Sequence, residues 1–460
     1  MSEETPIESG ERIPWSLVER YDRPLPRYTS YPPVPRWSSQ DDSCAHPGLE
    51  HVAATHAQIS AYVHVPFCHR MCAYCGCNTT VTKRANVIER YRDTLTTEIR
   101  RVSERTGAKT LKQLHFGGGT PTMLTLDGLE RVVETLFGCF PPHENAELGI
   151  EVDPTRIADR DFLRLRAMGF NRISLGIQDF DRDVQAAIGR FQWAELSLRA
   201  FELARAAGFA SINVDLMYGL PLQTEQQLEN NAAKIVALAA DRVALFGYAH
   251  VPQMKPHQRR LESYPMPTAR ERWEMFCAAQ EVLTGAGYRP IGFDHFALPS
   301  DELVVHADRL NRNFQGYTLL EPMPVLGFGA SAISDLGDRF VQNTKRLSSY
   351  TEAIESGGLA TDFGYVRSAE DEARRTLIVQ LMCRLKLDFD TLPLLEQSVA
   401  LQVRKTHSET LEAFASHGLI KFTDRQLRVT ERGRPFLRHV ASCFDEAATQ
   451  LPSAPYSRAV

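Results

Sequence analysis

The stretch Cys68-His-Arg-Met-Cys72-Ala-Tyr-Cys75-Gly-Cys77 places four cysteines within ten residues. The first three are spaced Cys-x3-Cys-x2-Cys, so one short loop can bind three irons of a cubane [4Fe–4S] cluster through its thiolates. The fourth iron is then open to another ligand. Electron-transfer clusters are usually closed by four thiolates, whereas an open coordination position is typical of catalytic metal sites. The spacing therefore predicts a reactive cluster.

Two other uses of these cysteines fit less well. A structural zinc site would need a second Cys or His pair after a longer loop, and His64 and His69 do not have that spacing. A disulfide would require an oxidising compartment. The polar, acidic start Met1-Ser2-Glu3-Glu4 does not resemble a signal peptide, so we expect a cytoplasmic protein with reduced thiols.

Composition is that of an ordinary globular protein. Of the 460 residues, 43 % are apolar and 24 % are charged, and the length is enough for two or three domains. The net charge of −5 predicts no general attraction to nucleic acid. No run of about 18 apolar residues is present, so no transmembrane helix is predicted.

From Ile59 onward, apolar runs of strand length alternate with longer segments of helical periodicity. This alternation predicts a parallel sheet with right-handed crossover helices, and six such units would form a partial barrel. Thr125 and Thr224 are expected to cap helices at their N-termini and Gly208 at a C-terminus. The predicted strands are Ile59–Val65, Leu111–Phe116, Leu148–Val152, Arg172–Ile177, Ser211–Met217 and Val243–Tyr248. The predicted helices are Asn86–Arg105, Leu126–Phe137, Asp159–Ala167, Trp193–Ala207 and Glu225–Ala239.

The expected fold class is α/β: a partial (β/α)6-type barrel with an extended N-terminal arm and a small, mostly helical C-terminal domain. We assign residues 1–55 to the arm, 56–349 to the barrel with its extension, and 350–460 to the C-terminal domain. The last range has winged-helix character, with helices predicted over 369–384, 399–416 and 432–448. A hairpin is predicted from Leu419–Phe422 and Gln426–Val429.

In a barrel of this kind the functional loops follow the carboxyl ends of the strands, and the cysteine loop follows the first strand. The second strand ends in His115-Phe-Gly-Gly-Gly-Thr-Pro-Thr122, whose glycines let backbone approach a ligand closely. This glycine run does not match G-x-G-x-x-G or a P-loop. Polar residues also stand at or just beyond later strands, either as loop hydrogen-bonders or around a shared pocket: Glu151, Gln178, Asp215 and His250. Arg190, in a loop, would by default be a solvated surface arginine.

These features resemble the radical S-adenosylmethionine superfamily and, within it, the oxygen-independent coproporphyrinogen III oxidases. The resemblance covers nearly the whole chain. It is carried by the cysteine loop with its extension Cys75-Gly-Cys77-Asn78 and by Tyr62-Val-His-Val-Pro-Phe-Cys68, Arg27-Tyr-Thr-Ser-Tyr-Pro32, Gly176-Ile-Gln-Asp-Phe180, Asp215-Leu-Met-Tyr-Gly-Leu-Pro221, Phe293-Asp-His-Phe-Ala297, Asn313-Phe-Gln-Gly-Tyr317 and Leu326-Gly-Phe-Gly329.

The resemblance implies specific site residues. Cys68, Cys72 and Cys75 would bind the cluster, and S-adenosylmethionine would close the open iron. A first S-adenosylmethionine would contact Tyr62, Gly118, Glu151 and Ile333. A second would contact Tyr74, Gly119, Thr120, Gln178, Arg190, Asp215 and Ala249. Cys77 matches a cysteine that is not a cluster ligand but is needed for activity, and a purely structural thiol is the open alternative.

The implied reaction is oxidative decarboxylation of two propionates of coproporphyrinogen III to vinyl groups, giving protoporphyrinogen IX through a 5′-deoxyadenosyl radical. An unidentified low-potential electron donor and a terminal electron acceptor would be needed. Because propionates are anions, Arg27 on the arm is a candidate anchor for the substrate. We expect a monomer without nucleic-acid or membrane partners.

Two alternatives differ in class. The related haem chaperone shares the three-cysteine core but usually lacks the Cys-Gly-Cys-Asn extension and the long arm, both of which are present here. A passive electron-transfer protein is disfavoured by the open cluster corner and the size of the chain. Haem binding without turnover would favour the first alternative, and cluster reduction without S-adenosylmethionine cleavage the second.

Overall fold

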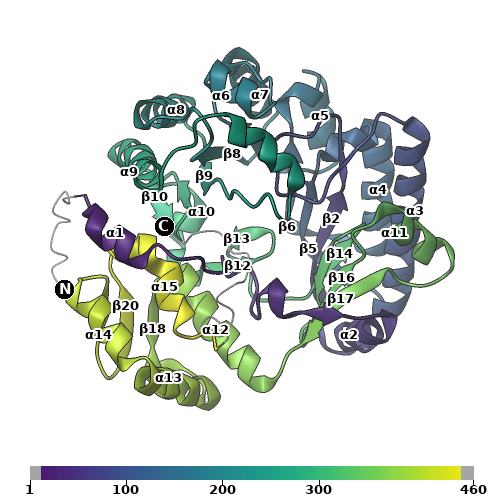
Figure 1. The fold of residues 1–460 in the computed structure, drawn as a ribbon. Coiled ribbons are helices and arrows are strands. Elements are labelled where there is room, and N and C mark those ends of the chain that lie inside the picture. Colours follow the sequence, from purple (N-terminus) through teal and green to yellow (C-terminus); the bar gives the residue numbers. More distant parts are fainter. Residues whose placement is uncertain (1–11, 447–460) are drawn as a thin grey trace.

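The centre of the molecule is one sheet of thirteen strands (Figure 1). The structure, a computed structural model, describes residues 12–446. Six strands in the middle of this sheet are parallel and lie side by side in chain order, which confirms the predicted βα units. They are β2 (Gln58–Val65), β5 (Thr110–Gly118), β6 (Pro142–Val152), β7 (Arg172–Gln178), β8 (Ser211–Tyr218) and β9 (Arg242–Gly247).

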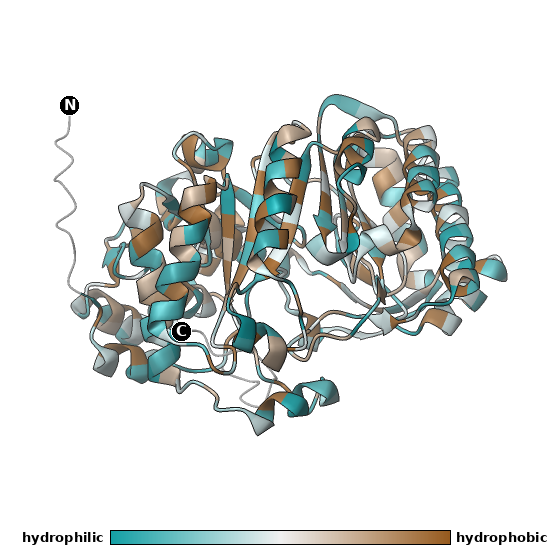
Figure 2. Cartoon of the chain, turned by 90° about the horizontal axis from the view of Figure 1, so that it is seen from above, coloured by the Kyte–Doolittle hydropathy of each residue, from teal (hydrophilic) through white to brown (hydrophobic). Residues whose placement is uncertain are grey.

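Helices cover the outer face of these strands (Figure 1). Helix α4 shows why they pack there: Leu129, Val132, Val133 and Leu136 repeat at helical spacing and are all buried. In Figure 2, hydrophobic and hydrophilic residues alternate along the helices and strands, as expected for elements with one buried face. The outer helices are α3 (Ala85–Thr106), α4 (Leu126–Cys139), α5 (Asp161–Ala167), α6 (Arg182–Ala187), α7 (Ala194–Ala206), α8 (Glu225–Leu238) and α9 (Ala269–Gly285).

Two of the three predicted helix caps are confirmed. The Thr125 hydroxyl accepts a hydrogen bond from the Gly128 N–H, and Thr224 forms a reciprocal capping box with Gln227. The third predicted cap, Gly208 at the C-terminus of α7, was placed one residue too late, because the C-cap is Ala207. Gly208 is the next residue, with a φ of +82°, and takes the left-handed conformation that glycine favours just after a helix.

The sheet continues past both sides of the parallel core. Beside β2 lie the parallel β14 and then antiparallel strands, and beside β9 lie two short antiparallel strands. The strand order thus runs from β1 to β10, and the predicted partial barrel and α/β class are confirmed. The added elements are β1 (Ser38–Ser39), β10 (Arg289–Ile291), β11 (His295–Ala297), α10 (Glu302–Val305), β12 (Asn311–Asn313), β13 (Gly316–Thr318), β14 (Val325–Phe328), β15 (Ile333–Asp335), β16 (Arg339–Asn343), α11 (Leu347–Glu355) and β17 (Thr361–Val366).

The sheet includes β17, which the sequence division had placed in the C-terminal domain. Strand β17 pairs with β16 on one side and with β1 on the other. Cutting the chain near residue 350 would therefore open a long edge of the sheet. We propose that the boundary between barrel and C-terminal domain lies at about residue 367 instead.

The N-terminal arm carries two helices that its composition did not indicate. Helix α1 (Trp15–Tyr21) packs on the C-terminal domain, where the Tyr21 ring contacts Phe414 and Phe436. Helix α2 (Asp42–Thr55) lies beside α3 and β17 at the opposite side of the sheet (Figure 1). The segment between them is extended, so the arm links the C-terminal domain to the far edge of the sheet. Residues 1–11 lie outside the described residues.

The C-terminal domain combines helices with a small three-stranded sheet, and its winged-helix character stays a prediction. The predicted hairpin forms from β19 (Ile420–Phe422) and β20 (Gln426–Val429), and an unpredicted β18 (Lys386–Asp388) joins it. The single helix predicted over 399–416 is wrong, because non-helical backbone at His407 divides it into α13 (Leu394–Thr406) and α14 (Ser408–Ser416). Helix α12 (Ala369–Arg384) is as predicted. The last predicted helix is α15 (Leu437–Ser442) after a 3-10 turn, and its residues 447 and 448 lie outside the described residues.

No helix within residues 12–446 combines the length and the apolar character that crossing a membrane requires.

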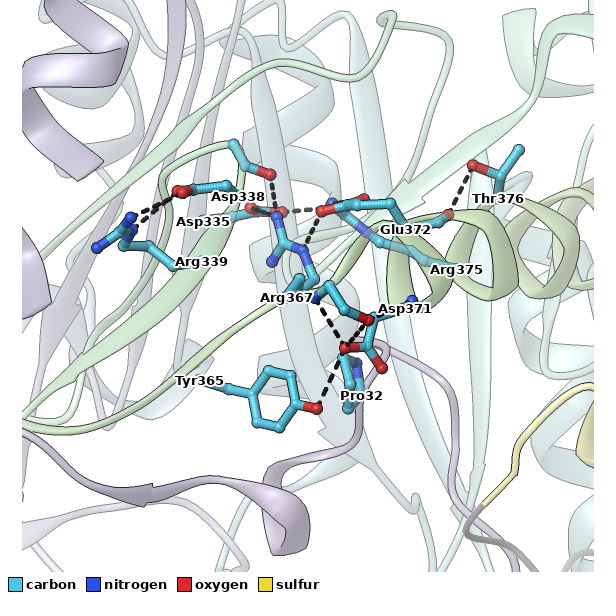
Figure 3. Close-up of polar contacts among 12 residues, drawn as sticks. Pro32, Asp335, Asp338, Arg339, Tyr365, Arg367, Asp371, Glu372, Arg375 and Thr376 are labelled. Carbon is cyan, nitrogen blue, oxygen red and sulfur yellow. Dashed lines mark hydrogen bonds and ion pairs between the residues drawn. The ribbon is translucent and has the colours of Figure 1, made fainter. Parts of the chain in front are cut away.

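A buried ion-pair network fixes the C-terminal domain to the sheet (Figure 3). Arg367, at the junction, has a fully buried side chain whose guanidinium donates to Asp335 of β15 at 2.8 Å and also pairs with Glu372 of α12. Its charge lies 4.2 Å from the ring centroid of Phe340. Arg375 of α12 holds the other oxygen of Asp335. Because one carboxylate serves two arginines, α12 cannot shift on the sheet without breaking buried pairs.

We expect Arg367→Met to lower the free energy of unfolding by roughly 3–5 kcal/mol, because it leaves the buried Asp335 carboxylate with one partner fewer. Urea denaturation followed by circular dichroism would measure the loss. The control is Arg90→Met, which removes an exposed pair with Glu355 and should cost less than about 1 kcal/mol. Equal losses in the two variants would contradict the anchoring role of Arg367.

Candidate active site

The carboxyl ends of the parallel strands surround a cavity of about 660 Å³. It collects most of the residues that the sequence analysis assigned to the site, from the cysteine loop and from the ends of five successive strands, β5 to β9. Tyr62 and Ile333 do not line it, and His250 pairs with Glu262 instead. The predicted residues in its lining are Cys68, Cys72, Tyr74, Cys75, Cys77, Gly118, Gly119, Thr120, Glu151, Gln178, Arg190, Asp215 and Ala249, and Arg27 of the arm joins them.

The cysteine loop begins directly after β2. Short strands β3 (Phe67–Cys68) and β4 (Thr80–Val81) pair at its base, so the loop leaves and returns at one point. Farther out, the Ala73 N–H donates to the Ile188 carbonyl at the end of α6. Cys68, Cys72 and Cys75 are half-buried, whereas Cys77 is exposed.

The three predicted ligand thiols lie in different electrostatic surroundings. Burial raises the pKa of Cys68 to about 11, and it raises that of Cys72 against the opposing charge of Arg190. A hydrogen bond from Cys77 lowers the pKa of Cys75 to about 6, and the same interaction raises that of Cys77.

The donor set fits an iron–sulfur cubane. Three thiols on one loop face the same cavity, and thiolates are the usual ligands of such clusters. Among residues 12–446, no three His, Cys, Asp or Glu side chains are grouped tightly enough to bind one metal ion.

The glycine run after β5 is required by close packing. A Cβ on Gly119 would lie 2.6 Å from the Phe67 carbonyl oxygen and 3.1 Å from the Cys68 sulfur. A Cβ on Gly118 would lie within 3 Å of the His64 ring, and its φ of +111° also favours glycine. The glycines thus let the end of β5 touch the base of the cysteine loop. This close packing is a second reason for glycine here, beside the predicted close approach of a ligand.

Glu151 is oriented by backbone and side-chain contacts at the end of β6. One carboxylate oxygen accepts the Gly118 N–H at 3.2 Å, and the other lies 3.1 Å from His115 Nε2. Tyr62 stacks on the His115 ring from β2, and its hydroxyl lies 2.9 Å from His64 Nδ1. Tyr62 therefore stands behind the residues that shape the cavity wall.

Asp215, on β8, is a buried carboxylate with neutral partners. It accepts hydrogen bonds from Asn213 at 2.8 Å and from Ser174 at 3.2 Å. Burial raises its pKa to about 6, and the nearby negative charge of Glu151 adds to the effect. Asp215, with neutral hydrogen-bond partners, and Glu151, with His115 as its neighbour, thus face one cavity, an arrangement that favours a cationic or hydroxyl-rich ligand.

Arg190 is the residue for which the default expectation of a solvated surface arginine was wrong. Its side chain is only 12 % exposed and reaches the Gly176 carbonyl at 2.6 Å, Asp153 at 3.5 Å and the Cys72 sulfur at 3.8 Å. Gln178 lies beside it at a strand irregularity, with a φ of +70°, a strained conformation for a residue other than glycine.

Ile333 lies outside the cavity. It is on β15, and its backbone packs against Gly327, whose partner on β2 is Tyr62. The paired strands β14 and β2 therefore lie between Ile333 and the cavity. The contact of Ile333 with S-adenosylmethionine stays a prediction.

Three residues that hold the cysteine loop were missed. Lys255, His257 and Gln258 follow β9 and hydrogen-bond to backbone carbonyls of the loop. They belong to no motif and are close to the loop only in the folded chain, so no sequence signal could have identified them.

Known proteins resemble the chain along nearly its whole length. Residues 62–235 match the model of the radical SAM superfamily, and residues 368–436 match that of the HemN C-terminal domain. The oxygen-independent coproporphyrinogen III oxidase of Salmonella typhimurium is 38 % identical over 446 residues, covering 95 % of this chain and 96 % of that protein. The Pseudomonas aeruginosa enzyme of the same name is 36 % identical over 469 residues, covering 98 % and 100 %. The chain belongs to this family.

The fold agrees with that membership. The solved coproporphyrinogen III oxidase of Escherichia coli, a radical SAM enzyme, superposes with a TM-score of 0.86 at 35 % identity, covering 94 % of this chain and 98 % of that one. As a member of the family, the chain is a radical S-adenosylmethionine enzyme with a [4Fe–4S] cluster and S-adenosylmethionine as cofactors. These relatives are named as oxidases, which disfavours the haem chaperone.

Single Ala replacements of Cys68, Cys72 or Cys75 should abolish the cluster after anaerobic reconstitution, because each removes one of three thiolates. Iron content and visible absorbance would measure this. Cys77→Ala is the matched control in the same loop and should keep the cluster. A cluster that survives Cys75→Ala but not Cys77→Ala would reverse the assignment.

Glu151→Gln should weaken S-adenosylmethionine binding about ten- to a hundredfold, because a charge-assisted hydrogen bond is worth roughly 1.5–3 kcal/mol. Anaerobic calorimetry on the reconstituted protein would measure the affinity. Glu147→Gln, on the same strand and face but outside the main cavity, is the control and should bind normally. Unchanged affinity in Glu151→Gln would remove Glu151 from the binding site.

Proposed function

We propose that this chain catalyses the oxygen-independent oxidative decarboxylation of two propionate side chains of coproporphyrinogen III to vinyl groups, giving protoporphyrinogen IX in haem biosynthesis. The observation that carries the proposal is the single cavity in which the cysteine loop, the glycine strand end and the polar strand ends meet. Kinship with named oxidases along nearly the whole chain supports the reaction.

The proposed roles begin with the cluster. Cys68, Cys72 and Cys75 would hold it and leave one iron open toward the cavity. When bound, the cluster and S-adenosylmethionine supply the one-electron chemistry that yields the hydrogen-abstracting 5′-deoxyadenosyl radical. The chain's own contribution is to bind, orient and shield the reacting groups.

Two S-adenosylmethionine sites are proposed at the cavity. Gly118 and Glu151 line it and would serve the first molecule, in which Glu151 would accept hydrogen bonds from ribose hydroxyls or from the ammonium group. Tyr62 and Ile333 do not line the cavity, and their contacts with the first molecule are carried only by the family resemblance. The residues proposed for the second are Tyr74, Gly119, Thr120, Gln178, Arg190, Asp215 and Ala249. The presence of Arg190 and Asp215 in one cavity supports this site, because they could pair with the carboxylate and the ammonium group of one amino acid.

Substrate carboxylates are proposed to bind on the β9 side of the cavity. Arg27 lines the cavity there and stacks on Phe246, with its charge 5.3 Å from the ring centroid. Its ion-pair partner is Asp294, and Arg312 approaches the neighbouring Phe293 ring. Arg27 and Arg312 thus bring positive charge to the β9 side of the cavity, where a propionate could bind.

Cys77 is proposed to act near the cluster without binding it. Its hydrogen bond to the Cys75 sulfur supports a role in adjusting a ligand, and its exposure would let it reach a substrate. We also propose that the protein is a cytoplasmic monomer. It would receive electrons from a low-potential donor and pass the last electron to a terminal acceptor.

The decisive experiment is anaerobic reconstitution with iron and sulfide, followed by incubation with coproporphyrinogen III, S-adenosylmethionine and dithionite. We expect protoporphyrinogen IX, and brief exposure to air should abolish both turnover and cluster absorbance. Haem binding without turnover would favour the chaperone, and cluster reduction without S-adenosylmethionine cleavage would favour an electron-transfer protein.

Arg27→Gln should raise the KM for coproporphyrinogen III about tenfold or more while leaving the affinity for S-adenosylmethionine unchanged, because it removes a charge that faces the substrate. Steady-state kinetics and calorimetry would separate the two effects. Arg23→Gln is the control on the same arm, since Arg23 donates to Ser442 of α15. A normal KM in Arg27→Gln would place the propionates elsewhere.

A further inference from the structure

One short segment after β9 faces the cysteine loop with three hydrogen-bond donors. Lys255 Nζ donates to the Cys77 carbonyl at 2.9 Å, His257 Nε2 to the Cys75 carbonyl at 2.9 Å, and Gln258 Nε2 to the Tyr74 carbonyl at 3.0 Å. A carbonyl only accepts, so His257 must carry its proton on Nε2. Four consecutive residues, 255–258, thus hold three carbonyls of the loop.

Gln258 is the fixed point of this segment. Its side chain is buried, and the same Nε2 also donates to the Ala249 carbonyl at 3.2 Å. Its Oε1 accepts the Val251 N–H at 2.7 Å. Both ends of the amide are therefore bonded, and Gln258 ties Tyr74 of the loop to Ala249 just beyond β9.

The outer half of the loop has few other attachments. Within residues 12–446, every hydrogen bond accepted by the carbonyls of residues 74–77 comes from this segment. A Cβ on Gly76 would meet nothing within 4 Å, and Cys77 is exposed. The Cys75 N–H also donates to the Cys72 carbonyl at 3.2 Å, and Tyr74 packs on a buried apolar cluster, so the three donors add the hydrogen bonds that fix the carbonyl side of this half of the loop.

The segment also places positive charge at the loop. Lys255 Nζ lies 2.9 Å from the carbonyl oxygen of Cys77, two residues beyond Cys75. Positive charge beside a cluster favours its reduced form, because reduction adds negative charge. The hydrogen bond to the Cys77 carbonyl keeps the Lys255 ammonium group next to the cysteine loop.

We propose that Lys255, His257 and Gln258 are positioning residues for the cysteine loop, and that Lys255 raises the reduction potential of the cluster bound there. The proposal rests on the proposed function, because it requires the cluster. It assigns to this segment the control of where Cys75 lies and of how readily the cluster accepts an electron.

The test is a redox titration of the reconstituted full-length protein, followed by electron paramagnetic resonance. Lys255→Met should keep its iron content but lower the equilibrium constant for cluster reduction about three- to tenfold, and tenfold corresponds to about 59 mV for one electron. Lys255→Arg should restore the potential. Lys234→Met removes the same charge from the outer helix α8, where no hydrogen bond joins Lys234 to the cysteine loop among the described residues, and should leave the potential unchanged.

A second variant tests geometry rather than charge. Gln258→Leu has no amide donor for Tyr74 and Ala249, so the resonance spectrum of the reduced cluster should change even where iron is retained. An unchanged potential in Lys255→Met together with an unchanged spectrum in Gln258→Leu would overturn the proposal. Failure of the parent protein to assemble any cluster would instead refute the proposed function, so the two failures are distinguishable.

Discussion

The contact between Gly119 and the base of the cysteine loop is the constraint on which the site depends. Only a residue without a Cβ fits there, because the Phe67 carbonyl and the Cys68 sulfur occupy the space. This contact brings the second strand end against the loop of the first. Glu151 then reaches Gly118 from β6, and Asp215 follows from β8. Parallel strands place these ends at one edge, and the glycines let them close around one cavity.

The arm and the C-terminal domain complete that cavity from the other side. Arg438 of α15 donates to the backbone carbonyls of Leu25 and Pro26, directly before Arg27. Helix α15 therefore sets the course of the arm, and the arm delivers Arg27 to the cavity. The buried Arg367 network holds the same domain on the sheet. Binding of a large anionic substrate would thus depend on a domain that carries no cluster ligand.

The parts of this molecule that sequence could predict are those encoded locally. Periodicity located the six strands, and spacing located the cysteine loop. Contacts between distant segments could not be predicted: Arg190 looked like a surface residue until folding placed it beside Cys72. Helix α1 is stabilised by Phe414 and Phe436, more than 390 residues away in the chain. His407 divides a helix that periodicity alone would continue.

The central claim is that the cavity performs radical chemistry on a propionate side chain. The most direct measurement uses coproporphyrinogen III deuterated at the propionate β-carbons, in an anaerobic incubation analysed by mass spectrometry. The account predicts deuterium in the 5′-deoxyadenosine formed, in step with the appearance of vinyl groups. Vinyl formation with unlabelled 5′-deoxyadenosine, or without any cleavage of S-adenosylmethionine, would contradict it.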